Sequence, residues 1–114
     1  MYQKLIIIGH IGSSDLKYTG EGKPVLSFSV ATSRRYKDSE ETTWFRCTYW
    51  GEYAEEASRR LAKGMRVMVE GQLRPDPATG SPKVYEKRDG SWGASYEVAV
   101  DTYRTLSKSE EVNA

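Results

Sequence analysis

The chain has one cysteine and one histidine, and this scarcity excludes several kinds of site. A lone Cys47 forms no disulfide within the chain, and a lone His10 leaves no basis for a Cys/His metal site. Cys47 fits best as a small core residue. A catalytic nucleophile needs a base within reach, but His10 stands beside a glycine at a predicted strand end, where a turn or capping role fits better. We therefore expect no enzyme activity, no metal and no cofactor.

Long apolar runs and a strong charge of one sign are also missing. The longest apolar run covers only residues 5–8, far short of the ~20 residues that cross a membrane. No signal or transit pattern opens the chain, so we expect a cytoplasmic, nucleoid-associated protein, or alternatively one of the mitochondrial matrix. The formal net charge is only +1, so a nucleic-acid partner must be argued from where the charges lie.

The order of predicted elements indicates the fold class. A chain of 114 residues suffices for one domain with a real core. Apolar alternation predicts five strands, and helical spacing followed by Gly64 as the stop predicts one helix over about residues 52–63. The strands are predicted at residues 3–9, 25–33, 42–50, 67–73 and 96–105, with a turn-rich loop at 10–24 and a polar connection at 34–41. This all-β order with a small inserted helix is that of a five-stranded OB-fold barrel, although another small β-barrel also fits.

The segment between the last two strands, residues 74–94, is too long for a bare loop. It opens with "RPDPATGSP", whose prolines forbid a central strand. Further on, Asp89-Gly90 predicts a two-residue hairpin turn. We therefore predict a protruding β-hairpin between strands four and five. The domain is expected to span residues 1–106, and a short polar, disordered tail is expected at 107–114.

The third predicted strand contains "WFRCTYW" at residues 44–50 and has two unlike faces. Alternate side chains of a strand point to opposite sides. One face is the natural core contributor: Phe45, Cys47 and Tyr49. The other is too polar for a core and too aromatic for a plain surface: Trp44, Arg46, Thr48 and Trp50. Such a face suits stacking on bases and contact with phosphate, whereas the alternative is aromatic pairing or capping within the protein.

Further aromatic residues lie among cations. Tyr36 has basic neighbours at Arg34, Arg35 and Lys37. Tyr85 has them at Lys83, Lys87 and Arg88. Flat rings and cations are what binding of a single strand requires, and each base–aromatic stack contributes ~1–3 kcal/mol. Charged loops are also commonly just solvated. Trp92, across the predicted turn from Tyr85, is the weaker candidate because the two rings are able to pack on each other.

Four segments resemble the bacterial and mitochondrial single-stranded DNA-binding (SSB) family in order and spacing, over about residues 4–106. They are "KLIIIGHIG", "FSVATSRRY", "TTWFRCTYWGEYAEEASRRLAKG" and "VMVEGQLRP". The resemblance implies an OB-fold subunit of a homotetramer that wraps single-stranded DNA in replication, recombination and repair. It implies stacking aromatics at Tyr36, Trp44 and Trp50, with Tyr85 as a fourth. It implies phosphate-contacting cations at Arg46, Lys63 and Lys4.

The chain also departs from the family pattern. His10 replaces the usual asparagine of a turn, and Glu52 stands where relatives often carry lysine, which should weaken attraction of the DNA backbone near Trp50. The sequence ends "SKSEEVNA", where bacterial members usually continue to an acidic tip, so enzyme partners recruited by such a tip are not predicted. The alternatives are a primosome-type or RNA-binding OB protein, and a structural oligomerisation module with the strand-three aromatics in a subunit interface.

Overall fold

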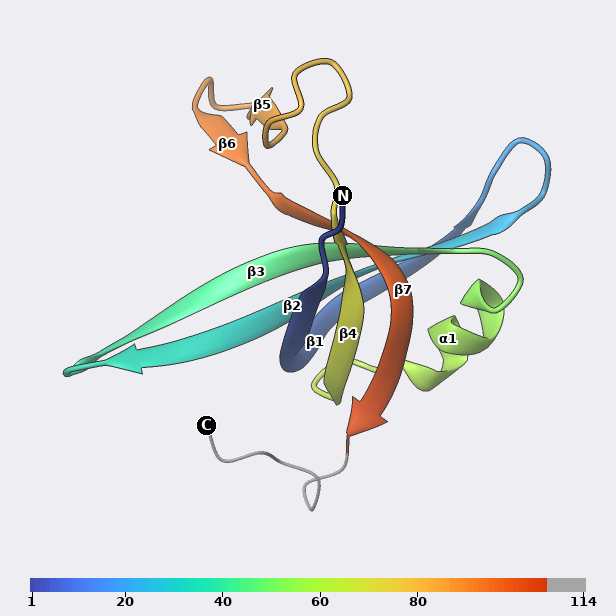
Figure 1. The fold of residues 1–114 in the computed structure, drawn as a ribbon, viewed down its shortest axis with the longest axis horizontal. Helices are drawn as coiled ribbons and strands as arrows, with labels where there is room; N and C mark the ends of the chain where they lie inside the picture. The colour runs from blue at the N-terminus through green and yellow to red at the C-terminus, as the bar shows by residue number, and fades with distance from the viewer. Residues whose placement is uncertain (107–114) are drawn as a thin grey trace.

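The computed structural model describes residues 1–106, so the predicted tail lies outside the described residues. Five long strands close into a barrel in the ring order β1-β2-β3-β7-β4 (Figure 1). Among the barrel strands of residues 1–106, only β3 and β7 pair in parallel. The elements are β1 (Leu5–Tyr18), β2 (Pro24–Tyr36), β3 (Ser39–Trp50), α1 (Ala54–Arg60), β4 (Arg66–Leu73), β5 (Val84–Glu86), β6 (Trp92–Ala94) and β7 (Tyr96–Leu106). This is the OB-fold barrel that the element order predicted.

The core is built from alternate side chains of the barrel strands, as half-buried antiparallel strands require. Phe28 is its largest fully buried side chain, and Cys47 is completely buried, as predicted. Helix α1 packs against the barrel through buried Ala54, Ala57 and the following Leu61. The barrel strands contribute Ile7, Ile11, Leu26, Val30, Val67, Val69, Val98 and Val100. Within residues 1–106, no helix is long and apolar enough to span a membrane.

The prediction of a turn-rich loop over residues 10–24 is wrong for most of that segment, because β1 runs on to Tyr18. His10 therefore lies in the sheet, paired with Ala31, and does not occupy a turn. A bulge between Ile11 and Ser14 shifts the register, which breaks the apolar alternation that marks a strand in sequence. Only the last part of the segment, around residues 19–23, is a turn.

The polar connection predicted over residues 34–41 is instead the end of a long β-hairpin, which we call the β2–β3 arm. Strands β2 and β3 pair continuously out to Tyr36, leaving Lys37 and Asp38 as the turn. The arm projects far from the barrel (Figure 1). Opposite charges face each other across it and support pairing where no apolar alternation exists. The facing pairs are Arg34 with Glu41 and Arg35 with Glu40.

Two further boundaries differ from prediction. Helix α1 ends at Arg60, and Gly64, with a φ of 86°, turns the chain into β4 instead of stopping the helix. The protruding hairpin is present as the separate β5–β6 sheet (Figure 1). Its turn is a three-residue loop and not a two-residue one, since the Lys87 N–H donates to the Ser91 carbonyl. Gly90 closes the loop at a φ of 88°, which glycine adopts without strain.

Candidate nucleic-acid interface

The outer face of β3 carries the two tryptophans and the arginine predicted to share a surface. Trp44 is 54% exposed and Trp50 is 51% exposed, and Arg46 between them is exposed. Cys47 points the other way and is fully buried. Half of each indole is therefore available to a ligand while the strand's other side holds the core. The predicted division of β3 into two faces is confirmed.

The Trp44 indole extends across β2 and lies against β1. Its cross-strand neighbour on β2 is Ala31, whose small side chain leaves room for the ring. A Cβ atom at Gly12 would lie only 2.6 Å from the indole Cζ3, so this glycine is in direct contact with Trp44. Two small residues thus form a seat for the ring, and the seat restricts its position before any ligand arrives.

A polar groove of about 350 Å³ lies on the β1, β2 and β3 face that carries Arg46. Two serines are joined across the strands, since the Ser13 N–H donates to the Ser29 hydroxyl at 2.9 Å. Ser29 is also the cross-strand neighbour of Arg46. The groove is lined by Ser13, Asp15, Lys17, Ser27, Phe28, Ser29 and Arg46. Hydroxyls and a guanidinium are the groups that position the sugar–phosphate backbone of a nucleic acid.

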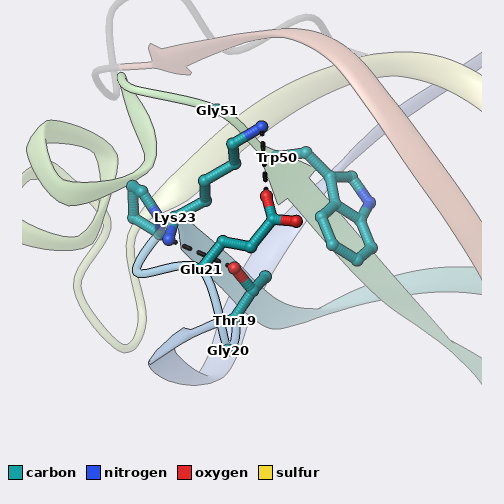
Figure 2. Close-up of a pocket in the computed structure, with 7 residues that line it drawn as sticks. Thr19, Gly20, Glu21, Lys23, Trp50 and Gly51 are labelled. Atoms are coloured by element: carbon teal, nitrogen blue, oxygen red, sulfur yellow. Dashed lines mark hydrogen bonds and ion pairs between the residues drawn. The ribbon is translucent and has the colours of Figure 1, made fainter.

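Trp50 lies at the other end of the face, beside a second pocket of about 570 Å³ (Figure 2). The pocket's opposite wall is the connection between β1 and β2, including Glu21 and Lys23. From the side of β4, the Arg74 guanidinium lies 5.4 Å from the centroid of the indole, a cation–π distance. The outer face of β3 therefore has one cation in its middle, Arg46, and one at its end, Arg74.

Besides Asp15 in the groove, the carboxylates of Glu97 and Glu52 reduce the positive potential of this face. Glu97 on β7 pairs in register with Arg46, and its Oε2 is buried without a hydrogen-bond partner within residues 1–106. Glu52 is exposed just beyond Trp50. Since like charges repel, both acids weaken the attraction of phosphate at the points where they lie.

The single thiol cannot serve as a nucleophile at neutral pH. Burial, with the nearby charge of Glu97 adding to it, raises the pKa of Cys47 to about 12. The thiolate is the reactive form, so a buried, protonated thiol is chemically inert. The core role predicted for Cys47 is the one it has.

The β2–β3 arm carries Tyr36 on the opposite face from Trp44. Ala31 of β2 pairs with Trp44, so both side chains lie on the outer face. Because side chains alternate along β2, Arg35 lies on the same face as Ala31 and Tyr36 lies on the opposite face. The Arg34 guanidinium and the Lys37 ammonium lie 5.9 and 5.6 Å from the centroid of the Tyr36 ring. Tyr36 is 54% exposed between these two cations. The arm is thus a second aromatic and basic surface, separate from the outer face of β3.

The hairpin β5–β6 also has two different faces, which corrects the expectation that its rings pack together. Tyr85 pairs with Gly93 and Trp92 with Glu86, so the two rings point to opposite sides. A Cβ at Gly93 would meet both the Tyr85 ring and the Lys87 stem, which places ring and cation on one face. Trp92 is 68% exposed on the other face. The other predicted cations of the hairpin are exposed: Lys83 and Arg88.

The last two predicted cations differ in position. Lys63 is exposed in the turn after α1, where the next residue donates its N–H to the Ile11 carbonyl beside Gly12. Lys4 lies on the β4 side of the barrel, and its Nζ is 3.0 Å from the Glu70 carboxylate, which raises the pKa of Lys4 through a hydrogen bond. The structure therefore brings the turn that carries Lys63 towards Gly12 and Trp44, whereas the Lys4 ammonium is paired with Glu70.

Comparison with known sequences agrees with this geometry. The sequence profile of the single-strand binding protein family matches residues 2–107. The chain belongs to the single-strand binding protein family.

Relatives with curated names fall in the same family. The chain is 38% identical to "Single-stranded DNA-binding protein 1" of Chlorobaculum tepidum, over 70% of this chain and 56% of the relative. It is 36% identical to "Single-stranded DNA-binding protein" of Xylella fastidiosa, over 90% of this chain and 62% of the relative. It is 39% identical to "Single-stranded DNA-binding protein" of Xanthomonas campestris, over 71% of this chain and 51% of the relative. The chain thus spans less than two thirds of the length of these relatives.

The structure adds two residues to the interface that were not predicted as site residues, Gly12 and Arg74. Arg74 had a sequence signal, because it follows β4 directly in "GQLR", but only the barrel brings it to Trp50. Gly12 ends the motif "KLIIIGHIG", but its contact with Trp44 was not predictable, since it spans three strands. Both act on the tryptophans that this member of the single-strand binding family presents on β3.

Proposed function

We propose that this chain binds single-stranded DNA with little sequence preference and protects and organises exposed strands in replication, recombination and repair. The observation that carries the proposal is the outer face of β3, where two half-exposed indoles flank Arg46. The relatives carry the name single-stranded DNA-binding protein. Acting on DNA in this way would place the protein at the nucleoid, and the proposal includes no catalytic step.

Binding on this face combines stacking with backbone contacts. Unstacked bases lie on Trp44 and Trp50, which are roughly 20 Å apart along the strand at about 3.3 Å per residue. The DNA between the two stacked bases crosses the polar groove, where Arg46 and the serine hydroxyls contact its phosphate and sugar groups. Stacking is tolerant of sequence because every base has a flat π-face. Tyr36 on the arm and Tyr85 on the hairpin extend the same chemistry beyond the barrel.

The assembly is proposed to be a homotetramer, on two features of β1. Residues 5–9 pair with β4, whereas the pairing of β1 with β2 begins only at His10, so one edge of the first half of β1 is open among residues 1–106. Ile6 and Ile8 on this half are 56% and 42% exposed. An open edge with exposed isoleucines suits strand pairing between copies. Light scattering with and without oligo(dT) measures the number of subunits.

A competition experiment tests the proposed function. Fluorescence anisotropy of a labelled oligo(dT) follows binding, and unlabelled competitors of equal length are then added. Single strands of mixed sequence are expected to compete well and duplex DNA poorly, because duplex bases are not free to stack on the indoles. Equal competition by duplex DNA would contradict the proposal. Stronger competition by RNA would favour an RNA-binding OB protein.

A further inference from the structure

The pocket beside Trp50 has a wall that is held in place by hydrogen bonds. The Thr19 N–H donates to the Lys23 carbonyl at 2.8 Å, and the Lys23 N–H donates to the Thr19 hydroxyl at 3.1 Å. Gly22, at a φ of 82°, donates its N–H to the Thr19 carbonyl. This tight turn fixes the backbone that carries Glu21 and Lys23. In Figure 2 the Glu21 carboxylate lies between the Lys23 side chain and the Trp50 indole.

We propose that this pocket is a base-reading subsite, in which a base stacked on Trp50 presents its Watson–Crick edge to Glu21 and Lys23 and guanine is favoured over thymine. The inference rests on the proposed binding of single-stranded DNA and adds a preference to it. Trp50 and the turn wall are both lining residues of the pocket, whose volume of about 570 Å³ accommodates a nucleobase. Arg74 contacts the indole but does not line the pocket, which leaves the pocket side of the ring to the base.

The side chains of the wall have the donor and acceptor pattern that guanine complements. The Lys23 Nζ and the Glu21 Oε2 are 3.7 Å apart, longer than the 2.7–2.9 Å of a charge-assisted hydrogen bond, so both retain capacity for a ligand. A carboxylate offers two acceptor oxygens and an ammonium offers three donors. Guanine presents adjacent N1–H and N2–H donors to the carboxylate and its O6 to the ammonium.

The other bases match this wall less well. Thymine has one donor, N3–H, between two carbonyl oxygens that a carboxylate repels. Cytosine and adenine each have one amino group and are expected between thymine and guanine. Both wall side chains are largely exposed, 82% for Glu21 and 75% for Lys23, so water competes for the same groups. The preference is accordingly expected to be small, about threefold in affinity.

Substitution of one base in an oligo(dT) tests the inference. Tryptophan fluorescence titrations compare oligo(dT) with oligomers of equal length that carry one central guanine or one central hypoxanthine. We expect the guanine oligomer to bind about threefold more tightly than oligo(dT). Hypoxanthine lacks the N2 amino group and should lose most of that gain. Binding of oligo(dT) itself reports the proposed function separately.

Two matched variants distinguish base reading from general electrostatics. Glu21→Gln and Glu52→Gln each remove one exposed negative charge near Trp50, and each should raise affinity for oligo(dT). Only Glu21→Gln is expected to abolish the ratio between guanine and thymine oligomers, since Glu52 does not line the pocket. Equal affinity of the wild type for both oligomers, or an unchanged ratio in Glu21→Gln, would overturn the subsite while leaving the proposed function standing. Failure to bind any oligomer would overturn both.

Discussion

Trp44 and Trp50 share one face of β3, but their supports differ. Trp44 lies over Gly12 and beside Ala31, so its position depends on a lack of side-chain volume beneath it. Trp50 has a charged neighbour, Arg74, at 5.4 Å and a pocket beside it. Each platform is therefore controlled by residues from other strands. Substituting those neighbours tests the platforms without removing the indoles.

Gly12→Ala is expected to weaken binding of oligo(dT) several-fold. The added methyl group would lie 2.6 Å from the Trp44 indole and 2.8 Å from the Ser29 hydroxyl, so the ring must leave its seat. Isothermal titration measures the affinity, and a thermal melt confirms that the barrel is folded. In a Trp44→Ala background the same glycine substitution should cost clearly less, because the ring it displaces is gone and only the contact with the Ser29 hydroxyl remains. An equal loss in both backgrounds would show that Gly12 acts elsewhere.

The Cys47 thiol is expected to resist alkylation in the folded protein and to react readily in denaturant. Its pKa of about 12 lies above the ordinary value of 9.0 because of burial. A raised pKa means that the thiol contributes fully to the free energy of unfolding below pH 9 and that this contribution falls as pH rises towards 12, since the unfolded chain releases the proton first. Urea midpoints of wild type and Cys47→Ala across this interval measure the effect. Parallel pH profiles for the two proteins would contradict it.

Among the elements, the β2–β3 arm shows what charge pairing and turn geometry do beyond the core. Its strands continue past the barrel with opposite charges facing each other. At its tip, Lys37 has a φ of 54°, the left-handed region that costs a side chain roughly 1–2 kcal/mol. The arm therefore carries strain at the point nearest to Tyr36.

Lys37→Gly is expected to stabilise the tip of the arm by about 1 kcal/mol, because glycine adopts a positive φ without steric cost. Amide hydrogen exchange of the arm is the suitable readout, since the tip can open without unfolding the barrel. Asp38→Gly is the matched control, as the neighbouring turn residue has no positive φ. Slower exchange in the control than in Lys37→Gly would contradict this explanation.

Element order was predictable from sequence, whereas element length was not. Alternation of Leu26, Phe28 and Val30 reports a strand because one face is buried. Beyond the barrel both faces of the arm meet water, so no alternation marks its strands and they were predicted as a loop. In β1 the bulge after Ile11 hides the continuation in the same way. Apolar alternation in the sequence reveals a strand only where one of its faces is buried. The β2–β3 arm and the second half of β1 are held by cross-strand pairing instead, which the sequence pattern does not show.

For the candidate site, the residues that share one face of a strand were predictable, whereas their contacts with other strands were not. The strand period alone placed Trp44, Arg46 and Trp50 on one face, and the structure agrees. Contacts between distant strands were not accessible, which is why Arg74 was missed. The ion pair of Lys4 with Glu70 was not accessible either, because it is also a contact between separate segments, and the phosphate contact expected of Lys4 stays a prediction.

At the scale of the whole molecule, a net charge of +1 makes binding depend on local cations. The affinity for oligo(dT) is expected to fall steeply with salt. For each tenfold rise in salt concentration, log K should decrease by roughly 0.7 per phosphate contacted. Arg46→Met should make that slope shallower by roughly 0.7, the value of one phosphate contact, because the Arg46 guanidinium lies on the outer face of β3. Lys4→Met should reduce the slope less, because the Lys4 ammonium is already paired with the Glu70 carboxylate. A flat salt response in the wild type would argue against backbone contacts.

Intrinsic tryptophan fluorescence during titration with oligo(dT) tests most directly whether single-stranded DNA binds to the outer face of β3. The chain has three tryptophans, so variants separate their signals. Strong quenching is expected in the wild type and in Trp92→Phe, because bases stack on Trp44 and Trp50. The double variant Trp44→Phe with Trp50→Phe should lose most of the quenching. Saturated binding with no change in fluorescence, or quenching that disappears only with Trp92, would contradict the outer face of β3 as the binding surface.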